Sequence, residues 1–152
     1  MHYDCDLDVI RTSYPAQSTS RIYAEIAKDV SALWRQPELF DRVEAVLRKS
    51  EDDKSFVIEE NILICNAKVS DIDRPVHMLY RLSESIHFED RPINLVFVLL
   101  SPVEDGPFHL RRLSRLTRLL GDSVFCKKLH QSDDKDSIRA QFMYPELSEQ
   151  VA

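Results

Sequence analysis

The fold is decided by the stretch Arg91-Pro92-Ile93-Asn94-Leu95-Val96-Phe97-Val98-Leu99-Leu100-Ser101-Pro102. Between Ile93 and Leu100 only Asn94 is polar, so both faces of a strand formed here must be shielded from water. The pattern predicts a central strand of a sheet that is covered on both sides. Residues that follow such a strand and enter a helix lie where open α/β sheets usually place their sites, and His109 occupies that position.

A helix is predicted directly after this strand. Asp105-Gly106-Pro107 has the composition of a turn, and Gly121 can end the helix as its C′ residue. The apolar residues in between recur at helical spacing and predict a buried stripe of Leu110, Leu113, Leu116 or Thr117, and Leu120. The opposite side carries Arg111, Arg112, Arg115 and Arg118, which form either a solvated face or a surface that docks an acidic partner or a phosphoprotein.

The remaining elements are predicted from apolar periodicity and capping residues. Helices are expected at about 20–35, after the N-cap candidates Ser18-Thr19-Ser20, and at 37–49. Strands are expected at 55–58 and 62–65, which could pair as a hairpin, and at 76–82, whereas 83–91 is predicted to be a polar connection. Leu7, Val9 and Ile10 form an edge strand or a lead-in turn. Two short helices follow at the end, one capped by Asp122 and one with Ile138 and Phe142 as its apolar residues.

Helices, then strands, then helices predict an α/β fold with a mixed β-sheet flanked by helices. The chain has 152 residues, of which 43% are hydrophobic, so we expect a single domain over 1–152. The net charge of −6 disfavours nucleic acid and anionic membranes as partners. There is neither a leader-like N-terminus nor an apolar run of the roughly 20 residues needed to span a bilayer, so a cytoplasmic protein is expected.

Cysteine and glycine usage narrows the chemistry. Cys5, Cys65 and Cys126 are dispersed, which favours reduced thiols and gives no metal-ligand spacing. Only Gly106 and Gly121 are present, and phosphate-cradling nucleotide loops need several glycines. We therefore expect neither a metal nor a cofactor.

From about Leu7 to Phe142 the sequence resembles the enzyme IIA domain of the bacterial sugar phosphotransferase system, of the mannitol/fructose type that includes nitrogen-related regulatory proteins. The resemblance is carried by the 91–102 strand, by His109-Leu110 with Leu113, Leu116, Leu119 and Leu120, by Ser85-Ile86-His87-Phe88, and by 132–138. It implies a IIA sandwich fold. It also implies a phosphoryl relay, in which a histidine accepts the group from the carrier HPr and passes it to a sugar-specific IIB domain.

The chain departs from the family where the phosphoryl group would be carried. The segment that matches the family's acceptor motif is Asn61-Ile62-Leu63-Ile64-Cys65-Asn66-Ala67-Lys68, which places Asn66 at the acceptor position and leaves the neighbouring glycines and proline unmatched. No histidine lies between Tyr3 and Val76, so a shifted alignment cannot supply one. A carboxamide is a poor nucleophile toward phosphorus, although it can keep the hydrogen bonds of an imidazole. His109 matches a second histidine of the family's pocket.

Several interpretations stay open for these residues. His109 could keep a role in the old pocket, replace the acceptor, or have no special role, and we expect it to approach Asn66 if the alignment is right. Cys65 could carry a phosphoryl group but should face away from Asn66, since neighbours on a strand point to opposite sides. Glu104 and Asp105 would repel a phosphoryl group.

The sequence favours a regulatory or protein-binding pseudoenzyme whose partner is HPr, a IIB domain or a regulatory target. The alternative is an active phosphocarrier of fructose/mannitol-type sugar transport that uses His109 or another acceptor. An unrelated enzyme has no catalytic constellation in the sequence to support it.

Overall fold

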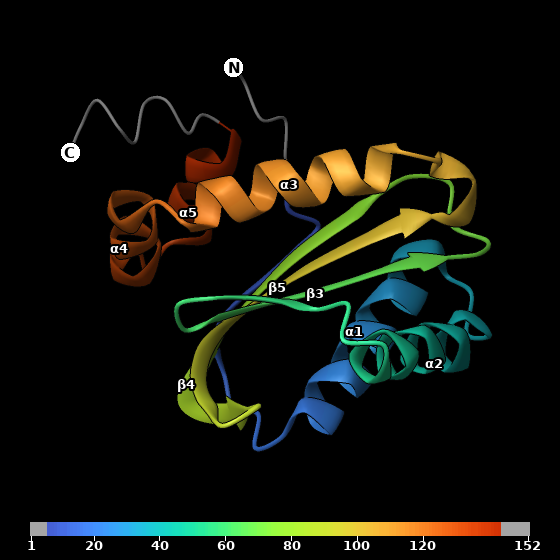
Figure 1. Cartoon of the computed structure of the whole chain (residues 1–152), viewed down its shortest axis with the longest axis horizontal. Coiled ribbons are helices and arrows are strands. Elements are labelled where there is room, and N and C mark those ends of the chain that lie inside the picture. The colour runs from blue at the N-terminus through green and yellow to red at the C-terminus, as the bar shows by residue number, and fades with distance from the viewer. Residues whose placement is uncertain (1–5, 144–152) are drawn as a thin grey trace.

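The computed structural model describes residues 6–143, so Cys5 and the residues after Met143 lie outside the described part of the chain. The elements, in chain order (Figure 1), are β1 (Val9–Tyr14), α1 (Thr19–Trp34), α2 (Leu39–Asp52), β2 (Val57–Glu59), β3 (Ile62–Val69), β4 (Val76–Phe88), β5 (Arg91–Pro102), the short 3-10 helix η1 (Val103–Asp105), α3 (Phe108–Leu120), α4 (Ser123–Gln131) and α5 (Lys135–Met143).

The strands form one mixed sheet in the order β1-β4-β5-β3-β2. β5 lies in the middle, antiparallel to β4 and parallel to β3, and every residue from Leu95 to Pro102 is buried. β1 is parallel to β4 at one edge, and β2 closes the other edge as a hairpin with β3. The central strand, the hairpin and the mixed sheet predicted from the sequence are confirmed, and the segment containing Val9 and Ile10 is an edge strand.

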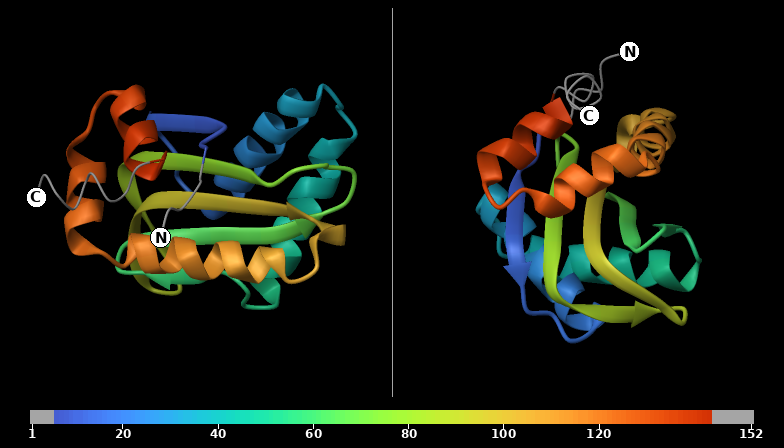
Figure 2. Two further views of the ribbon diagram at one scale, coloured as in Figure 1. Left: turned by 90° about the horizontal axis from the view of Figure 1, so that it is seen from above. Right: turned by 90° about the vertical axis from the view of Figure 1, so that its left-hand side faces the viewer.

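Helices cover both faces of the sheet (Figures 1 and 2), as predicted. α1 and α2 pack on the face that presents Leu63, Cys65 and Val98, and α3, α4 and α5 pack on the face that presents Ile64 and Phe97. Two apolar cores result, one on each side of β5. Within residues 6–143, no helix combines the length and the apolar character needed to cross a membrane.

Capping residues set the start of α1 and of α4, and a long-range contact holds the end of α4. Ser18 caps α1 by accepting a hydrogen bond from the Arg21 backbone N–H at 3.3 Å, and Asp122 caps α4 in the same way. Arg81 of β4 donates to the carbonyls of Leu129 and His130 at 3.2 and 3.3 Å, where α4 ends. A cation at a helix C-terminus satisfies carbonyls that have no partner within the helix, so Arg81 fastens α4 to the sheet.

Two predictions about local structure were wrong. The segment 83–91 is mostly strand rather than a polar connection, because Ile86 and Phe88 are buried on alternate positions and β4 continues to Phe88. Leu110 is 68% exposed, because His109 takes the inward position at the start of α3. Gly121 ends α3 directly after Leu120, as predicted, although its φ of −80° lies outside the left-handed region; a Cβ there would lie 3.2 Å from the Thr117 carbonyl oxygen.

A two-residue turn joins the two longest strands. Glu89 and Asp90 both have positive φ, 49° and 63°, which is the backbone of a tight hairpin turn whose twist matches that of the strands. Residues other than glycine adopt this conformation at a cost, so the flanking strands hold the turn in place.

Candidate functional site

Asn66 and His109 lie in contact at one end of the sheet. Asn66 is on β3, on the side that faces α3, and His109 is the second residue of α3. The His109 Nε2 and Asn66 Oδ1 atoms are 3.1 Å apart, and both residues are only 5% exposed. The fold therefore brings these two side chains together although they are 43 positions apart in the chain, as we expected from the family resemblance.

Hydrogen bonds continue from this pair in both directions. The Asn66 Nδ2 group donates to the Ser55 backbone carbonyl at 2.9 Å, and His109 Nδ1 lies 2.7 Å from Ser101 Oγ. Arg112 donates to the same Ser101 oxygen at 3.1 Å. We call Asn66, Ser101, His109 and Arg112 the α3-face cluster. Ser101 was not singled out from the sequence, although a serine that ends a long apolar run on a central strand is the signal of a buried polar position.

The donors and acceptors of the α3-face cluster can be assigned by elimination. The Ser55 carbonyl can only accept, so the amide NH2 of Asn66 must face it and Oδ1 must face His109. His109 then carries its hydrogen on Nε2 and donates it to Asn66, which leaves Nδ1 to accept from the Ser101 hydroxyl. The result is a one-way chain of hydrogen bonds from Arg112 through Ser101 and His109 to Asn66.

The surroundings keep His109 neutral. Burial lowers the pKa of His109, and the nearby positive charges of Lys68 and Arg112 lower it further, against a smaller opposing effect of Asp105. A neutral imidazole is what the assigned chain requires, because one ring nitrogen donates and the other accepts.

The charged rim of the cluster differs from expectation at two residues. Arg112 was predicted on the outer arginine side of the helix, but it turns inward to Ser101 and pairs with Asp105. Asp105 was expected to repel a phosphoryl group, yet its charge is met by that guanidinium. Lys68 lies at the same rim, with its Nζ 3.4 Å from the Gly106 carbonyl oxygen.

Comparison with known proteins places this chain in a family. Residues 15–143 match the family described as phosphoenolpyruvate-dependent sugar phosphotransferase system, EIIA 2. The chain belongs to this family. It is 29% identical over 141 residues to the nitrogen regulatory protein of Bradyrhizobium diazoefficiens, with 91% of each chain aligned. It is 32% identical over 79 residues to the fructose-specific EIIA component of Haloferax volcanii, covering 50% of this chain and 51% of that protein.

Solved structures show the same EIIA fold. Nitrogen regulatory protein IIA-Ntr from Neisseria meningitidis is similar with a TM-score of 0.78 at 18% identity, covering 88% of this chain and 92% of that one. The mannitol enzyme IIA of Escherichia coli, in its complex with phosphorylated mannitol enzyme IIB, gives a TM-score of 0.67 at 16% identity, covering 88% and 92%.

The other candidate residues of this EIIA chain lie apart from the α3-face cluster. Cys65 is fully buried on the opposite face of the sheet, so its predicted orientation is confirmed. Burial raises the pKa of its thiol, which holds the thiol in its unreactive protonated form. His77 is buried near Phe97, with ring centroids 6.2 Å apart, and His87 is exposed. Among the described residues, no three His, Cys, Asp or Glu side chains gather as a metal site would require.

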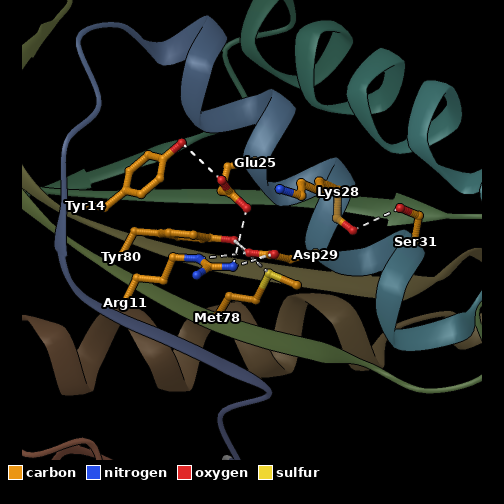
Figure 3. A network of polar contacts seen from close by, with 8 residues as sticks. All are labelled: Arg11, Tyr14, Glu25, Lys28, Asp29, Ser31, Met78 and Tyr80. Carbon is orange, nitrogen blue, oxygen red and sulfur yellow. Dashed lines mark hydrogen bonds and ion pairs between the residues drawn. The ribbon is translucent and has the colours of Figure 1, made fainter.

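A second polar cluster lies on the other face of the sheet, and the sequence analysis missed it (Figure 3). Asp29 of α1 accepts from Arg11 of β1 at 2.7 and 3.2 Å and from the buried Tyr80 hydroxyl at 2.7 Å. Glu25, one helical turn away, lies 3.4 Å from Arg11. We call Arg11, Glu25, Asp29 and Tyr80 the α1-face cluster. Its signal in the sequence is Asp29 itself, a carboxylate within the apolar stripe formed by Ile22, Ile26 and Val30.

Burial and carboxylate pairing shape the titration of the α1-face cluster. Burial raises the pKa of Glu25, and the hydrogen bond with Asp29 and the charge of Asp29 raise it further, whereas Arg11 opposes this. The pKa of Tyr80 is also raised, first by burial and then by Asp29. Glu25 therefore keeps its proton to a higher pH than a free glutamate does, beside Asp29, which is paired with Arg11.

Proposed function

We propose that this EIIA chain is a cytoplasmic regulatory domain that acts by binding a protein partner and does not carry phosphate at the family's acceptor position. The observation that carries the proposal is the engagement of every polar atom at that position. Asn66 is held between the Ser55 carbonyl and His109, and His109 is held between Asn66 and Ser101.

Phosphoryl transfer needs a nucleophile with an accessible lone pair. The amide nitrogen of Asn66 has its lone pair delocalised into the carbonyl, and it donates to Ser55 instead. The Nε2 atom of His109 carries a hydrogen, and its Nδ1 lone pair accepts from the fully buried Ser101. Neither side chain presents a free nitrogen lone pair, so the position lacks the nucleophile that phosphoryl transfer requires.

Two likenesses support a binding role. Alignment over 91% of both chains links this protein to one called a nitrogen regulatory protein, and a structural neighbour was solved with a phosphorylated IIB bound. HPr, a IIB domain or a regulatory target is therefore the kind of partner that we propose for this chain.

A phosphorylation assay tests the proposal. The protein is incubated with phosphoenolpyruvate, enzyme I and HPr, and its intact mass is measured under non-acidic conditions beside a IIA domain that has the acceptor histidine. We expect the control domain to gain one phosphoryl group and this chain to gain none.

Two variants sharpen the assay. Asn66→His asks whether the imidazole alone restores labelling, and His109→Ala identifies the acceptor if the unmodified protein is labelled. Labelling that disappears in His109→Ala would overturn the proposal and make the protein an active phosphocarrier that uses His109.

A further inference from the structure

The outward side of α3 is a strongly basic surface on an acidic protein. The helix Phe108–Leu120 contains four arginines and no acidic residue, in a chain with 26 Asp and Glu and a net charge of −6. Arg112 is committed to Asp105, but Arg111, Arg115 and Arg118 are exposed. Across the described residues, no carboxylate pairs with any of these three. Their charges are therefore free to meet a partner.

The same surface also exposes large apolar side chains. Phe108 is 51% exposed and Leu110 is 68% exposed, on either side of the buried His109. The Arg111 guanidinium lies over the Phe108 ring, 5.5 Å from its centroid. A hollow of about 310 Å³ runs along the helix and is lined by Leu110, Arg111, Ser114, Arg115 and Arg118. Together these side chains offer a partner an apolar contact beside three cationic ones.

We propose that this surface, which we call the α3 outer face (Phe108, Leu110, Arg111, Ser114, Arg115 and Arg118), docks an acidic amphipathic helix of a partner protein. The inference rests on the proposed binding function and names the chemistry of the partner. In Figure 1, α3 lies along one side of the sheet, and its outer side is turned away from the strands.

The spacing of the arginines fits a helical partner. Arg111, Arg115 and Arg118 are related as i, i+4 and i+7, so they follow one face over about 10 Å of helix. A partner helix with Glu or Asp at the same spacing can pair with them, and its apolar residues can pack on Leu110 and Phe108. Guanidinium groups suit carboxylates because they donate two parallel hydrogen bonds.

A long polyanion fits this surface less well than a short helix does. Outside the three free arginines the chain is even more acidic than its net charge of −6 indicates. A nucleic acid or an anionic membrane extends beyond the basic strip and meets that negative charge, since charges act over about 8 Å at physiological ionic strength. A helix of a few turns stays within the strip.

A designed peptide pair tests the inference on the full-length protein. One fluorescent helical peptide carries Glu at i, i+4 and i+7 beside a leucine stripe, and its matched partner has Lys in place of each Glu. Binding is measured by anisotropy at low and physiological salt, and the bound surface is mapped by backbone amide NMR shifts. We expect the Glu peptide to bind and the Lys peptide not to bind. Binding of the Glu peptide should weaken at the higher salt, and the amide chemical-shift changes should be confined to α3 and its neighbours.

Charge-matched variants make the result specific. Arg111→Gln/Arg115→Gln/Arg118→Gln should weaken binding about tenfold, because three exposed ion pairs with the peptide are lost. Arg21→Gln/Lys28→Gln/Arg35→Gln removes the same charge from α1 and the residue that follows it, and should leave binding unchanged. Leu110→Ser should weaken binding without changing the melting temperature, because the side chain is exposed.

Three results would overturn the inference. The first is that the Glu and Lys peptides bind equally well. The second is that both triple variants lose the same amount of affinity for the Glu peptide. The third is that anionic vesicles or duplex DNA bind through the same arginines while the Glu peptide does not. The peptide assay and the phosphorylation assay are independent. If the protein neither binds the Glu peptide nor gains a phosphoryl group, the docking surface is refuted and the proposed function still stands.

Discussion

The two polar clusters lie on opposite faces of one sheet and solve the problem of buried polar groups differently. The α3-face cluster joins Asn66, Ser101 and His109 through hydrogen bonds between neutral groups, with a single guanidinium at its rim. The α1-face cluster is ionic, with Asp29 shared by Arg11 and Tyr80. The first contains Asn66, which we propose stands at the family's acceptor position, and the second holds an edge strand to a helix. A buried polar network is therefore not by itself evidence of chemistry.

The largest effect is expected from removing the central carboxylate of the α1-face cluster. Asp29→Ala should lower the free energy of unfolding by about 3 kcal/mol, because Arg11 loses both bonds to Asp29 and the buried Tyr80 hydroxyl loses its acceptor. Urea denaturation measures the change, and Asp29→Asn, which retains an acceptor for Tyr80, is the milder control. A loss below about 1 kcal/mol would show that the ion pair does not hold β1.

Breaking the α3-face cluster should cost less. His109→Ala leaves Asn66 Oδ1 and the Ser101 hydroxyl without their partner, so the free energy of unfolding should fall by about 2 kcal/mol. A double-mutant cycle with Asn66→Ala isolates the contact. Additive losses would mean that the 3.1 Å contact contributes nothing to stability.

A smaller change is expected at the rim of the same cluster. Arg112→Gln removes the ion pair with Asp105 and weakens the bond to Ser101, for a loss of about 1 kcal/mol. The matched control is Arg115→Gln on the same helix, which should leave stability unchanged. Equal losses would show that Arg112 acts only through the charge of the helix.

The smallest effect distinguishes the clusters by the sign of their pH response. The pKa of His109 is lowered on folding, so its stabilising contribution is lost as the pH falls below its ordinary value of 6.5. The pKa of Glu25 is raised, so its contribution is present near and below the ordinary value of 4.5 and is lost as the pH rises through its folded value.

Denaturation of two variants that cannot titrate, measured across pH 4 to 7, checks these signs. His109→Gln should flatten the loss of stability at acid pH, and Glu25→Gln should gain stability relative to the unmodified protein as the pH rises. The same slope in both variants would contradict the opposite signs.

Sequence patterns could predict the parts of the structure that depend on local periodicity. The central strand follows from an unbroken apolar run, and α1 follows from Ile22, Ile26 and Val30 after a serine cap. The extension of β4 was missed because three exposed residues, Ser83 to Ser85, interrupt the alternation at an irregularity in the pairing with β5. Local patterns do not reveal where two strands fall out of register.

The candidate site was predictable only in part, for a related reason. Asn66 and His109 could be named because a family pattern identifies both positions. Ser101 could not, because its role depends on the register of β5 against α3. Tyr80 joins Arg11 and Asp29 through the parallel pairing of β1 with β4, in which Arg11 lies opposite Tyr80. Long-range strand pairing sets the positions of these side chains, and a short stretch of sequence carries no information on that pairing.

The tight turn at Glu89 and Asp90 also has a consequence for the order of folding. It joins β4 and β5, the two central strands, so their pairing closes a very short loop and costs little chain entropy. Each of the other two neighbours of this pair is parallel and distant in sequence: β1 joins β4, and β3 joins β5. We expect the β4–β5 hairpin to form first and β1 and β3 to pair with it afterwards. Val98→Ala in β5 should therefore slow refolding, whereas Phe142→Leu in α5 should mainly speed unfolding.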